Sequence, residues 1–367
     1  MIKLLFEDKI SVLILDKSNL AYPSLSKSHA SRFSIVSIIG GLETITLIVL
    51  TVIGLFITAQ MKVQQPLALE QVAFITIKPG TSFNAFSKQL VTNGWLENRF
   101  WLRSYIKFAP ELGEIKSGTY QVQANMPMIE LLKMVVVGKE HQFSITFIEG
   151  TTFKQVLAQL AQHPHINHQL TDLSIAAIAK RLSIEQANPE GWLFPDTYAF
   201  TQNTADIVII DRAHKKLRKT LDELWPNRAT ALPYTSPYQA LIMASIIEKE
   251  SGKHAEHPRI ASVFINRLHK KMRLQTDPTV IYGLGDRYQG DITYAHLREK
   301  TAYNTYKIKG LPPTPIALPG AQALQAALHP ELSHYLYFVS NGAGEHIFST
   351  NLADHNRAVT KYQRNKK

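Results

Sequence analysis

The 367-residue sequence contains no cysteine. This absence excludes disulfide bonds, a thiol nucleophile and zinc sites built on cysteine. It suits an exported protein that avoids thiol oxidation, although it does not by itself define the compartment. Charged residues are also sparse, at 19 % against 45 % hydrophobic residues, which excludes a largely disordered chain. A chain of this length has room for two or three domains.

Acidic residues are outnumbered, since 29 Asp and Glu stand against 40 Lys and Arg and leave a net charge of +11. Such an excess fits nucleic acid, an anionic lipid surface or an acidic polymer as the partner. Long basic runs and nucleic-acid recognition motifs are both absent from the sequence. We therefore expect no nucleic-acid partner.

The histidines do not follow a metal-binding pattern. His163, His165 and His168 form a cluster that a proline interrupts, and His254 and His257 are the other close pair. A zinc site typically needs two histidines at i,i+4 with a glutamate, or three convergent ligands. We expect no metal ion and no cofactor.

A long apolar stretch lies near the N-terminus, where charge is almost absent. Between Arg32 and Lys62 the only charged residue is Glu43. Residues 34–60 exceed the roughly 20 residues that cross a bilayer as a helix. A cleaved signal peptide is the main alternative, but Ala59, followed by Gln and Met, makes a poor cleavage site. We predict a single, uncleaved transmembrane helix at 34–60.

Basic residues near this span indicate its orientation. Lys17, Lys27 and Arg32 all precede the span. The positive-inside rule therefore places residues 1–33 in the cytoplasm as an N-terminal tail. The rest of the chain, joined through a linker at 61–72, is expected outside the cytoplasm.

Two segments of the exported part match each other, 78–90 and 148–160. Each follows an alternating, strand-like run and contains Gly-Thr, a second hydroxyl residue and Phe. The second hydroxyl can cap the helix that follows. The repeat fits either a common strand-turn-helix unit without functional meaning or a small α+β module that binds glycan.

A predicted helix that ends in Glu-Lys-Glu carries the candidate catalytic residue, Glu250. Ser236 and Pro237 indicate the start of this helix, and Gly252 lies just past its end. Helix ends rich in Glu and Lys are commonly only solvated, and solvation is the alternative to catalysis here.

The helical period separates the two glutamates of this helix. Counting back from Glu250 reaches an apolar stripe of Met243, Ile246 and Ile247. Glu248 shares its face instead with Leu241, Ala244 and Ser245. Burial and the negative end of the helix dipole both raise the pKa of the Glu250 carboxyl group. A carboxyl group that is protonated near neutral pH is what protonation of a glycosidic oxygen requires.

Three polar loops follow, at 273–279, 303–306 and 310–320. Their amides, hydroxyls and aromatic rings are groups with which proteins bind sugars. Each loop also has a plainer interpretation. Asp277 and Pro278 fit the N-cap and first residue of a helix, and the tyrosines fit core positions.

At these residues the chain resembles a known family. It contains in order Glu-Gly-Trp-Leu-Phe-Pro-Asp-Thr at 190–197, the helix end at 244–250, Val-Phe-Ile-Asn-Arg-Leu at 263–268, the polar loop at 273–282, and the motifs at 303–306 and 310–313. This order is similar to that of the endolytic murein transglycosylases, the YceG-like or MltG family, from about residue 70 to the C-terminus. Residues 1–33 depart from the family pattern, because members usually start just before their anchor.

The resemblance implies an α+β fold with a single N-terminal transmembrane helix, a small LysM-like α+β module at 73–142 and a larger mixed α+β catalytic domain at 143–367. It implies an enzyme of the bacterial inner membrane with a periplasmic catalytic part. Such an enzyme cleaves between N-acetylmuramic acid and N-acetylglucosamine within nascent glycan strands during cell wall synthesis. The implied partners are peptidoglycan glycan strands, the inner membrane and penicillin-binding synthases of the wall machinery.

The resemblance also assigns site residues. The family's catalytic glutamate matches Glu250. Substrate binding is expected at Gln275, Thr276, Asp277 and Asn304, with the adjacent Tyr303 and Ser251. Gln275 and Asn304 are expected to hold the N-acetyl groups and to orient the 6-hydroxyl.

The mechanism is expected to depend on one acid/base. No obvious second carboxylate accompanies Glu250, whereas the common hydrolytic routes need one. In a lytic transglycosylase, Glu250 would protonate the leaving oxygen and then accept the proton of the muramyl 6-hydroxyl, which closes a 1,6-anhydro ring. The alternatives are a non-catalytic membrane-anchored peptidoglycan-binding protein and a single-pass sensor or assembly factor.

Overall fold

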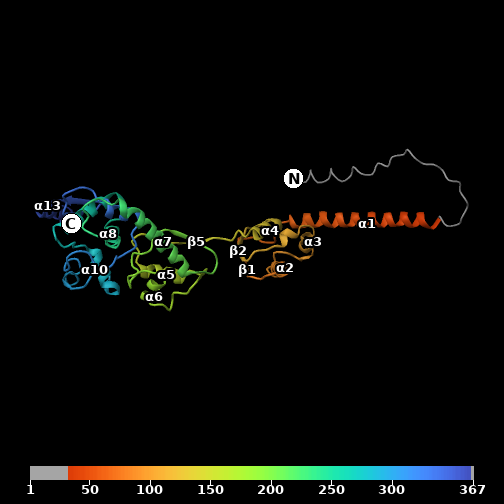
Figure 1. The fold of residues 1–367 in the computed structure, drawn as a ribbon, viewed down its shortest axis with the longest axis horizontal. Coiled ribbons are helices and arrows are strands. Elements are labelled where there is room, and N and C mark those ends of the chain that lie inside the picture. Colours follow the sequence, from red (N-terminus) through yellow and green to blue (C-terminus); the bar gives the residue numbers. More distant parts are fainter. Residues whose placement is uncertain (1–31, 365–367) are drawn as a thin grey trace.

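The computed structural model describes residues 32–364, with side chains described from residue 41 onward. The expected cytoplasmic tail at 1–33 lies almost wholly outside this range. The molecule is elongated, with helix α1 at one end, a small unit beside it and a larger C-terminal part at the other end (Figure 1). Its fold is mixed α+β, which confirms that part of the expected fold class.

The strands are short and form two-stranded sheets. β1 pairs with β2, β3 with β5 and β7 with β8 in antiparallel fashion, whereas β4 and β6 are parallel. The strands are β1 Ala73–Ile77, β2 Gly118–Val122, β3 Phe143–Thr146, β4 Ile166–Asn167, β5 Thr197–Phe200, β6 Thr204–Ala205, β7 Tyr337–Ser340 and β8 His346–Ser349. The α-helices are α1 Arg32–Val63, α2 Phe83–Thr92, α3 Phe100–Phe108, α4 Met128–Val137, α5 Phe153–Gln162, α6 Ile175–Arg181, α7 Asp206–Leu224, α8 Pro237–Glu250, α9 His257–His269, α10 Asp277–Leu284, α11 Tyr294–Arg298, α12 Ala321–Leu328 and α13 Leu352–Val359.

Helix α1 contains an apolar segment that overlaps the expected span at 34–60. Its segment Gly41–Val63 is long and apolar enough to cross a membrane, and an 18-residue window in it has a mean hydropathy of 2.2 with 6 % of its residues buried. Large apolar side chains such as Leu42 and Leu47 are each 66 % exposed. A helix that is apolar all round and exposed to this degree fits a lipid environment.

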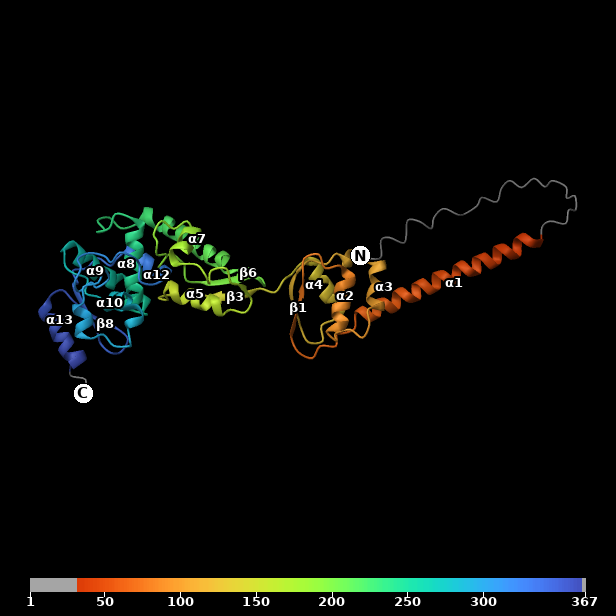
Figure 2. The ribbon, with the colours of Figure 1, turned by 90° about the horizontal axis from the view of Figure 1, so that it is seen from below.

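The small unit next to α1 is built on the β1–β2 pair, in which Ala73 lies opposite Val122. Helices α2, α3 and α4 enclose a core with the two strands (Figure 2). Ser82 caps α2, because its side chain accepts a hydrogen bond from the Ala85 amide, as the repeat predicted. The core includes Ile75, Ile77, Phe86, Leu90, Leu102, Tyr120, Leu131 and Leu132.

The segment 61–72, expected as a linker, is part of this small unit. Val63 and Leu67 are 2 % and 1 % exposed within the same core. The Leu67 amide donates to the Met126 carbonyl at 2.9 Å, and the Ala68 amide donates to the Trp95 carbonyl at 3.1 Å. The local composition, Gln-Gln-Pro at 64–66, indicated a linker. The hydrogen-bond partners that fix this segment lie far away in the sequence, so the local composition could not reveal them.

The second repeat follows the same local plan as the first. Strand β3 leads to Gly150, whose φ of 75° matches the 79° of Gly80 in the first repeat. Thr152 then caps α5 in a capping box with Gln155. This repeat belongs to a separate core with α6 and α7, which includes Phe147, Phe153, Val156, Ile178, Leu193, Ile209 and Ala213.

Helix α8 occupies the centre of the C-terminal part. Each residue from 240 to 247 is buried. Helices α9 and α12 pack against it. β7, β8 and α13 lie at the outer end of the C-terminal part. Because α8 is apolar on all sides, it is a core helix and has no single buried stripe.

Candidate active site

A cavity of about 580 Å³ opens at the C-terminal end of α8. Its walls come from α8, α9, the loop before α10, strand β7 and helix α13, segments that are distant in the sequence. The residues that line it include Glu250, Arg267, Gln275, Thr276, Asp277, Tyr306, Tyr337, His346 and His355. The sequence-derived catalytic residue and three of the six expected substrate-binding residues therefore share one cavity.

Glu250 is the last residue of α8. The helix starts as expected, with Ser236 accepting a hydrogen bond from the Gln239 amide and Pro237 as the first residue. It ends because Ser251 adopts an extended conformation, with φ −149° and ψ 129°. Gly252 lies one residue beyond this cap and does not adopt the left-handed conformation typical of a terminating glycine.

The carboxyl group of Glu250 has a pKa raised to about 7. Burial is the main cause, and the negative charge of Asp277 adds to it. The hydroxyl of Thr276, which donates a hydrogen bond to Glu250 Oε1, and the positive charge of Arg267 act in the opposite direction. A large fraction of Glu250 is therefore protonated near neutral pH, which is the state that a general acid needs.

The helical-face argument does not separate Glu250 from Glu248. The apolar stripe behind Glu250 is 0 % exposed at Met243, Ile246 and Ile247. The face behind Glu248 is equally buried, with 0 % exposure at Leu241, Ala244 and Ser245. The difference lies in the tertiary environment. The Glu250 side chain lines the cavity, whereas the Glu248 side chain lies on the opposite side of α8 and contacts another part of the chain.

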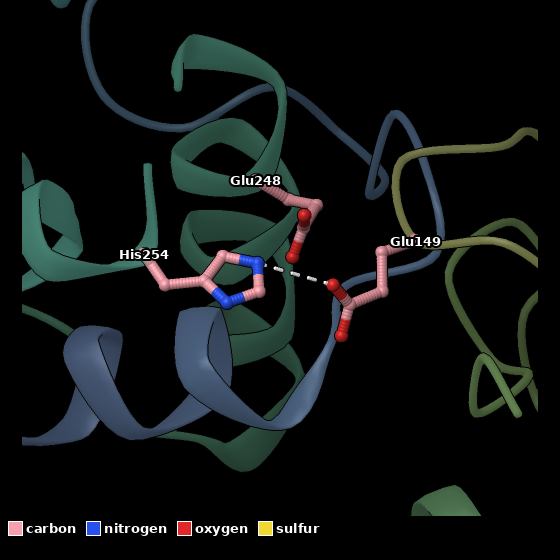
Figure 3. A group of neighbouring side chains, drawn as sticks. All are labelled: Glu149, Glu248 and His254. Atoms are coloured by element: carbon pink, nitrogen blue, oxygen red, sulfur yellow. Dashed lines mark ion pairs between the residues drawn. The ribbon is translucent and has the colours of Figure 1, made fainter. Parts of the chain in front are cut away.

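Glu248 lies beside Glu149 and His254 (Figure 3). Its Oε2 accepts a hydrogen bond of 2.9 Å from the Gly320 amide. Burial raises the pKa of Glu248, and the nearby Glu149 adds to the rise. His254 Nε2 lies 3.2 Å from Glu149 Oε2. The His254–Glu149 pair joins the start of the second repeat to the segment just after α8.

The same three side chains have the spacing of metal ligands. One ligand atom each from Glu149, Glu248 and His254 lies within 4.8 Å of the others. The His254–Glu149 ion pair and the Gly320 amide already partner these groups. The expectation that the protein needs no metal stays a prediction, and Glu248 is best described as a structural group.

The loop at 275–277 delivers the expected binding residues to the cavity. Gln275 adopts a left-handed conformation, with φ 52°, and its side chain is exposed. The Thr276 amide donates to Thr305 Oγ1 at 3.0 Å, which fixes the loop against the 303–306 motif. Thr276, not Asp277, is the N-cap of α10, and Asp277 is its first residue.

Asp277 is the second carboxylate that the sequence analysis did not find near Glu250. It lines the same cavity and is exposed. The hydroxyl of Tyr306 donates to Asp277 Oδ1 at 2.7 Å, which orients the carboxylate. Its charge also contributes to the raised pKa of Glu250. The mechanism must therefore account for two carboxyl groups in one cavity.

Asn304, Tyr303 and Ser251 are not among the residues that line the cavity. Asn304 is 1 % exposed, and its Nδ2 donates to three backbone carbonyls, at 3.1 Å, 3.2 Å and 2.7 Å. The Tyr303 hydroxyl pairs with Thr314 Oγ1 at 2.9 Å. The Ser251 carbonyl accepts a hydrogen bond of 2.7 Å from His257 Nε2. These groups hold the surrounding loops in this structure.

Arg267 is a cavity residue to which sequence reasoning gave no role. It is 8 % exposed, and its guanidinium donates to the Leu336 carbonyl at 2.6 Å and to the Leu274 carbonyl at 2.7 Å. The guanidinium also lies 5.1 Å from the centre of the Tyr337 ring. The sequence could have indicated that Arg267 is buried. It follows the buried Phe264 by three residues, which places both side chains on one face of α9.

Comparison with known proteins places this chain in a family. A sequence profile of the YceG-like family matches residues 75–361. A Bacillus subtilis protein named endolytic murein transglycosylase is 33 % identical over 305 residues, covering 78 % of this chain and 84 % of that protein. A protein of the same name from Streptococcus pneumoniae is 26 % identical over 326 residues, covering 80 % of this chain but only 58 % of its own length.

The chain belongs to the YceG-like family. The expected family is thereby confirmed, and these relatives carry the name of a peptidoglycan lytic transglycosylase. A crystal structure of a yceG-like protein from Listeria monocytogenes is 32 % identical, covers 78 % of this chain and 99 % of its own, and has a TM-score of 0.49.

Proposed function

We propose that this chain is an endolytic peptidoglycan lytic transglycosylase. It cleaves the bond between N-acetylmuramic acid and N-acetylglucosamine within nascent glycan strands and leaves 1,6-anhydro-muramic acid ends. The observation that carries the proposal is the carboxyl group of Glu250, with a pKa of about 7, at the wall of a cavity of about 580 Å³. The family relatives named endolytic murein transglycosylase support the same chemistry.

In the proposed reaction, Glu250 acts first as the acid and then as the base. Its proton moves to the glycosidic oxygen as the bond from that oxygen to C1 of the muramic acid breaks. Positive charge develops at C1 and the ring oxygen. The carboxylate of Glu250 then takes the proton of the muramyl 6-hydroxyl, whose oxygen bonds to C1. Atoms balance without water, and Glu250 ends in its protonated state.

Asp277 acts electrostatically in this proposal. Its negative charge raises the pKa of Glu250 and keeps the acid protonated before the reaction. The same charge stabilises the cationic centre that forms in the cavity. Asp277 lies on the exposed side, where Tyr306 orients it, and there it contacts substrate in the manner expected of a binding residue.

The presence of Asp277 also favours a second candidate function, hydrolysis by two carboxyl groups. In that reaction Asp277 would activate water or attack C1 directly. The tethered 6-hydroxyl favours the lytic route, because the effective concentration of such a group is on the order of 10⁵ M or more against about 55 M for water. The products distinguish the two candidates.

We place the chain in the bacterial inner membrane with α1 uncleaved and residues 64–364 outside the cytoplasm. Packing at the end of α1 supports retention of the helix. Ala59 and Val63 are 0 % and 2 % exposed, and the rings of Phe56 and Phe108 meet edge to face at 5.2 Å. Cleavage near residue 60 would remove Phe56 and Ala59 from these contacts. The basic residues before the span support a cytoplasmic N-terminus.

The two parts outside the membrane have separate proposed roles. The unit at 73–142, whose core also includes Val63 and Leu67, is proposed as a LysM-like module that holds glycan near the membrane. The part at 143–367 is proposed as the catalytic domain, because it contains the cavity. Penicillin-binding synthases remain the proposed protein partners, since nascent strands are their product.

Digestion of uncrosslinked glycan strands by the full chain in detergent micelles tests the chemistry. We expect fragments of many lengths from the start, each new muramic end carrying a 1,6-anhydro ring, with no water added. Reducing ends with one added water would identify a hydrolase. Release of disaccharides alone would leave the chemistry intact but remove the endolytic assignment.

A further inference from the structure

Helix α3 presents an outward face that combines aromatic and basic side chains. Phe100 and Phe108 are 57 % and 43 % exposed. Arg103 and Lys107, four residues apart, form an exposed basic stripe beside them. The opposite face of α3 packs against the core of the small unit, where Leu102 is 2 % exposed. Phe108, at one end of this face, contacts α1, whereas Phe100, Arg103 and Lys107 are exposed in the described part of the chain.

Contact with α1 determines where this face lies. The ring of Phe108 meets the ring of Phe56 edge to face at 5.2 Å. Phe56 lies seven residues before the end of the apolar segment Gly41–Val63, a distance of about 10 Å along the helix. Figures 1 and 2 both show α3 beside the C-terminal end of α1. One end of α3 is therefore level with the apolar part of the span.

The joint between α1 and the small unit is a packed one. Val63 and Leu67 belong to the core of that unit. Pro66 and Pro127 form a β-bridge just after the helix, and the Met128 amide donates to the Gln65 carbonyl at 3.2 Å. These contacts fix the position of the small unit relative to α1. Helix α3 therefore stays beside the outer end of the span.

We propose that the outward face of α3 docks on anionic phospholipid headgroups of the membrane that α1 spans, on its extracytoplasmic leaflet. Aromatic side chains prefer the bilayer interface, and an amphipathic helix with basic residues lies in its plane. Arg103 and Lys107 meet the lipid phosphates, to which basic side chains are attracted electrostatically. This inference rests on the proposed uncleaved span.

The docked helix holds the small unit flat against the membrane. The C-terminal part, which contains the cavity, lies at the end of the elongated molecule opposite α1 (Figure 2). A wall glycan is the competing partner for α3. The mixture of exposed Phe rings and basic groups beside an apolar span favours lipid.

The absence of cysteine in the sequence makes a site-specific label straightforward. We would reconstitute full-length Ser104→Cys protein, labelled with a polarity-sensitive fluorophore, into vesicles of phosphatidylcholine with and without phosphatidylglycerol. We expect a blue-shifted emission and quenching by lipid-borne nitroxide, both stronger with phosphatidylglycerol. A label at Ser144→Cys, on exposed β3 of the C-terminal part, is expected to show neither change.

A charge-matched pair of variants identifies the contact. In the Ser104→Cys background, Arg103→Gln with Lys107→Gln is expected to abolish the dependence on phosphatidylglycerol. Lys180→Gln with Arg181→Gln, which removes the same charge from exposed positions on α6, is expected to leave it unchanged.

Equal emission at Ser104→Cys and Ser144→Cys in protein that resists alkaline carbonate extraction would overturn the inference alone. Release of the protein by carbonate would overturn the span and, with it, this inference. An emission shift that requires added glycan strands in place of anionic lipid would assign the face to the wall and contradict the proposal.

Discussion

The hydroxyl of Thr276 donates a hydrogen bond to the carboxyl group of Glu250, 26 residues away in the sequence. This contact joins the start of α10 to the end of α8. It lowers the pKa of Glu250, while the adjacent Asp277 raises it. Two neighbouring residues therefore adjust the acidity of the proposed catalytic group in opposite directions.

Glu250→Gln is expected to reduce turnover by on the order of 10²–10⁴-fold or more, because the amide keeps the size of the side chain but has no proton to transfer. Glycan binding and the thermal melting point are expected to change little. Product formation from glycan strands, followed by mass spectrometry, measures the loss. A folded variant with full activity would remove Glu250 from the mechanism.

Glu248→Gln provides the control for that variant. The amide oxygen of Gln can still accept the hydrogen bond from the Gly320 amide, and Glu248 does not line the cavity. We expect turnover within a few-fold of the unaltered protein and a loss of unfolding free energy of about 1 kcal/mol or less. If Glu248→Gln is inactive and Glu250→Gln is active, the assignment of the two glutamates is reversed.

Thr276→Val and Asp277→Asn are expected to move the pH profile in opposite directions. Activity requires protonated Glu250, and it falls about tenfold per unit above the pKa of that group. Loss of the Thr276 hydrogen bond raises the pKa of Glu250 and moves the alkaline limb of kcat/KM upward. Loss of the Asp277 charge lowers the pKa and moves the limb downward. Equal profiles for the two variants would show that another group controls the limb.

Stability is expected to fall with rising pH because of Glu190. Burial raises the pKa of this carboxyl group to about 7, against 4.5 for its ordinary value. The folded state thus binds the proton more tightly than the unfolded state. The protonated carboxyl group of Glu190 contributes about 3 kcal/mol to the free energy of unfolding. This contribution is fully present below pH 4.5 and is lost as the pH rises through about 7.

Glu190→Gln measures this contribution. Glu190 Oε1 accepts hydrogen bonds from the amides of Phe153 and Gly191, at 2.9 Å and 3.3 Å, and the Gln oxygen can replace it. We expect urea unfolding of the variant to depend less on pH between 5 and 8. A pH dependence that matches the unaltered chain would contradict the assignment.

The C-terminus is expected outside the cytoplasm. A reporter that functions only in the cytoplasm, fused after Lys367, should therefore be silent, and a reporter fused before Met1 should be active. Activity of the C-terminal fusion would reverse the topology and separate the cavity from any wall substrate.

The sequence by itself determined the local elements of this protein. Ser236 and Pro237 set the start of α8, and Ser82 and Thr152 cap the helices of the two repeats. The apolar stretch predicted α1. These predictions succeeded because capping, proline geometry and continuous hydrophobicity act within a few residues of the chain.

Only the tertiary structure decided which residues form the site. Both faces of α8 are apolar, and the helical period could not show that Glu250 opens into a cavity while Glu248 meets Gly320. Burial depends on which distant segments pack against a residue. For the same reason the sequence could not show that the Asn304 amide donates hydrogen bonds to backbone carbonyls. Nor could it show that Asp277 lies beside Glu250 as a second carboxylate.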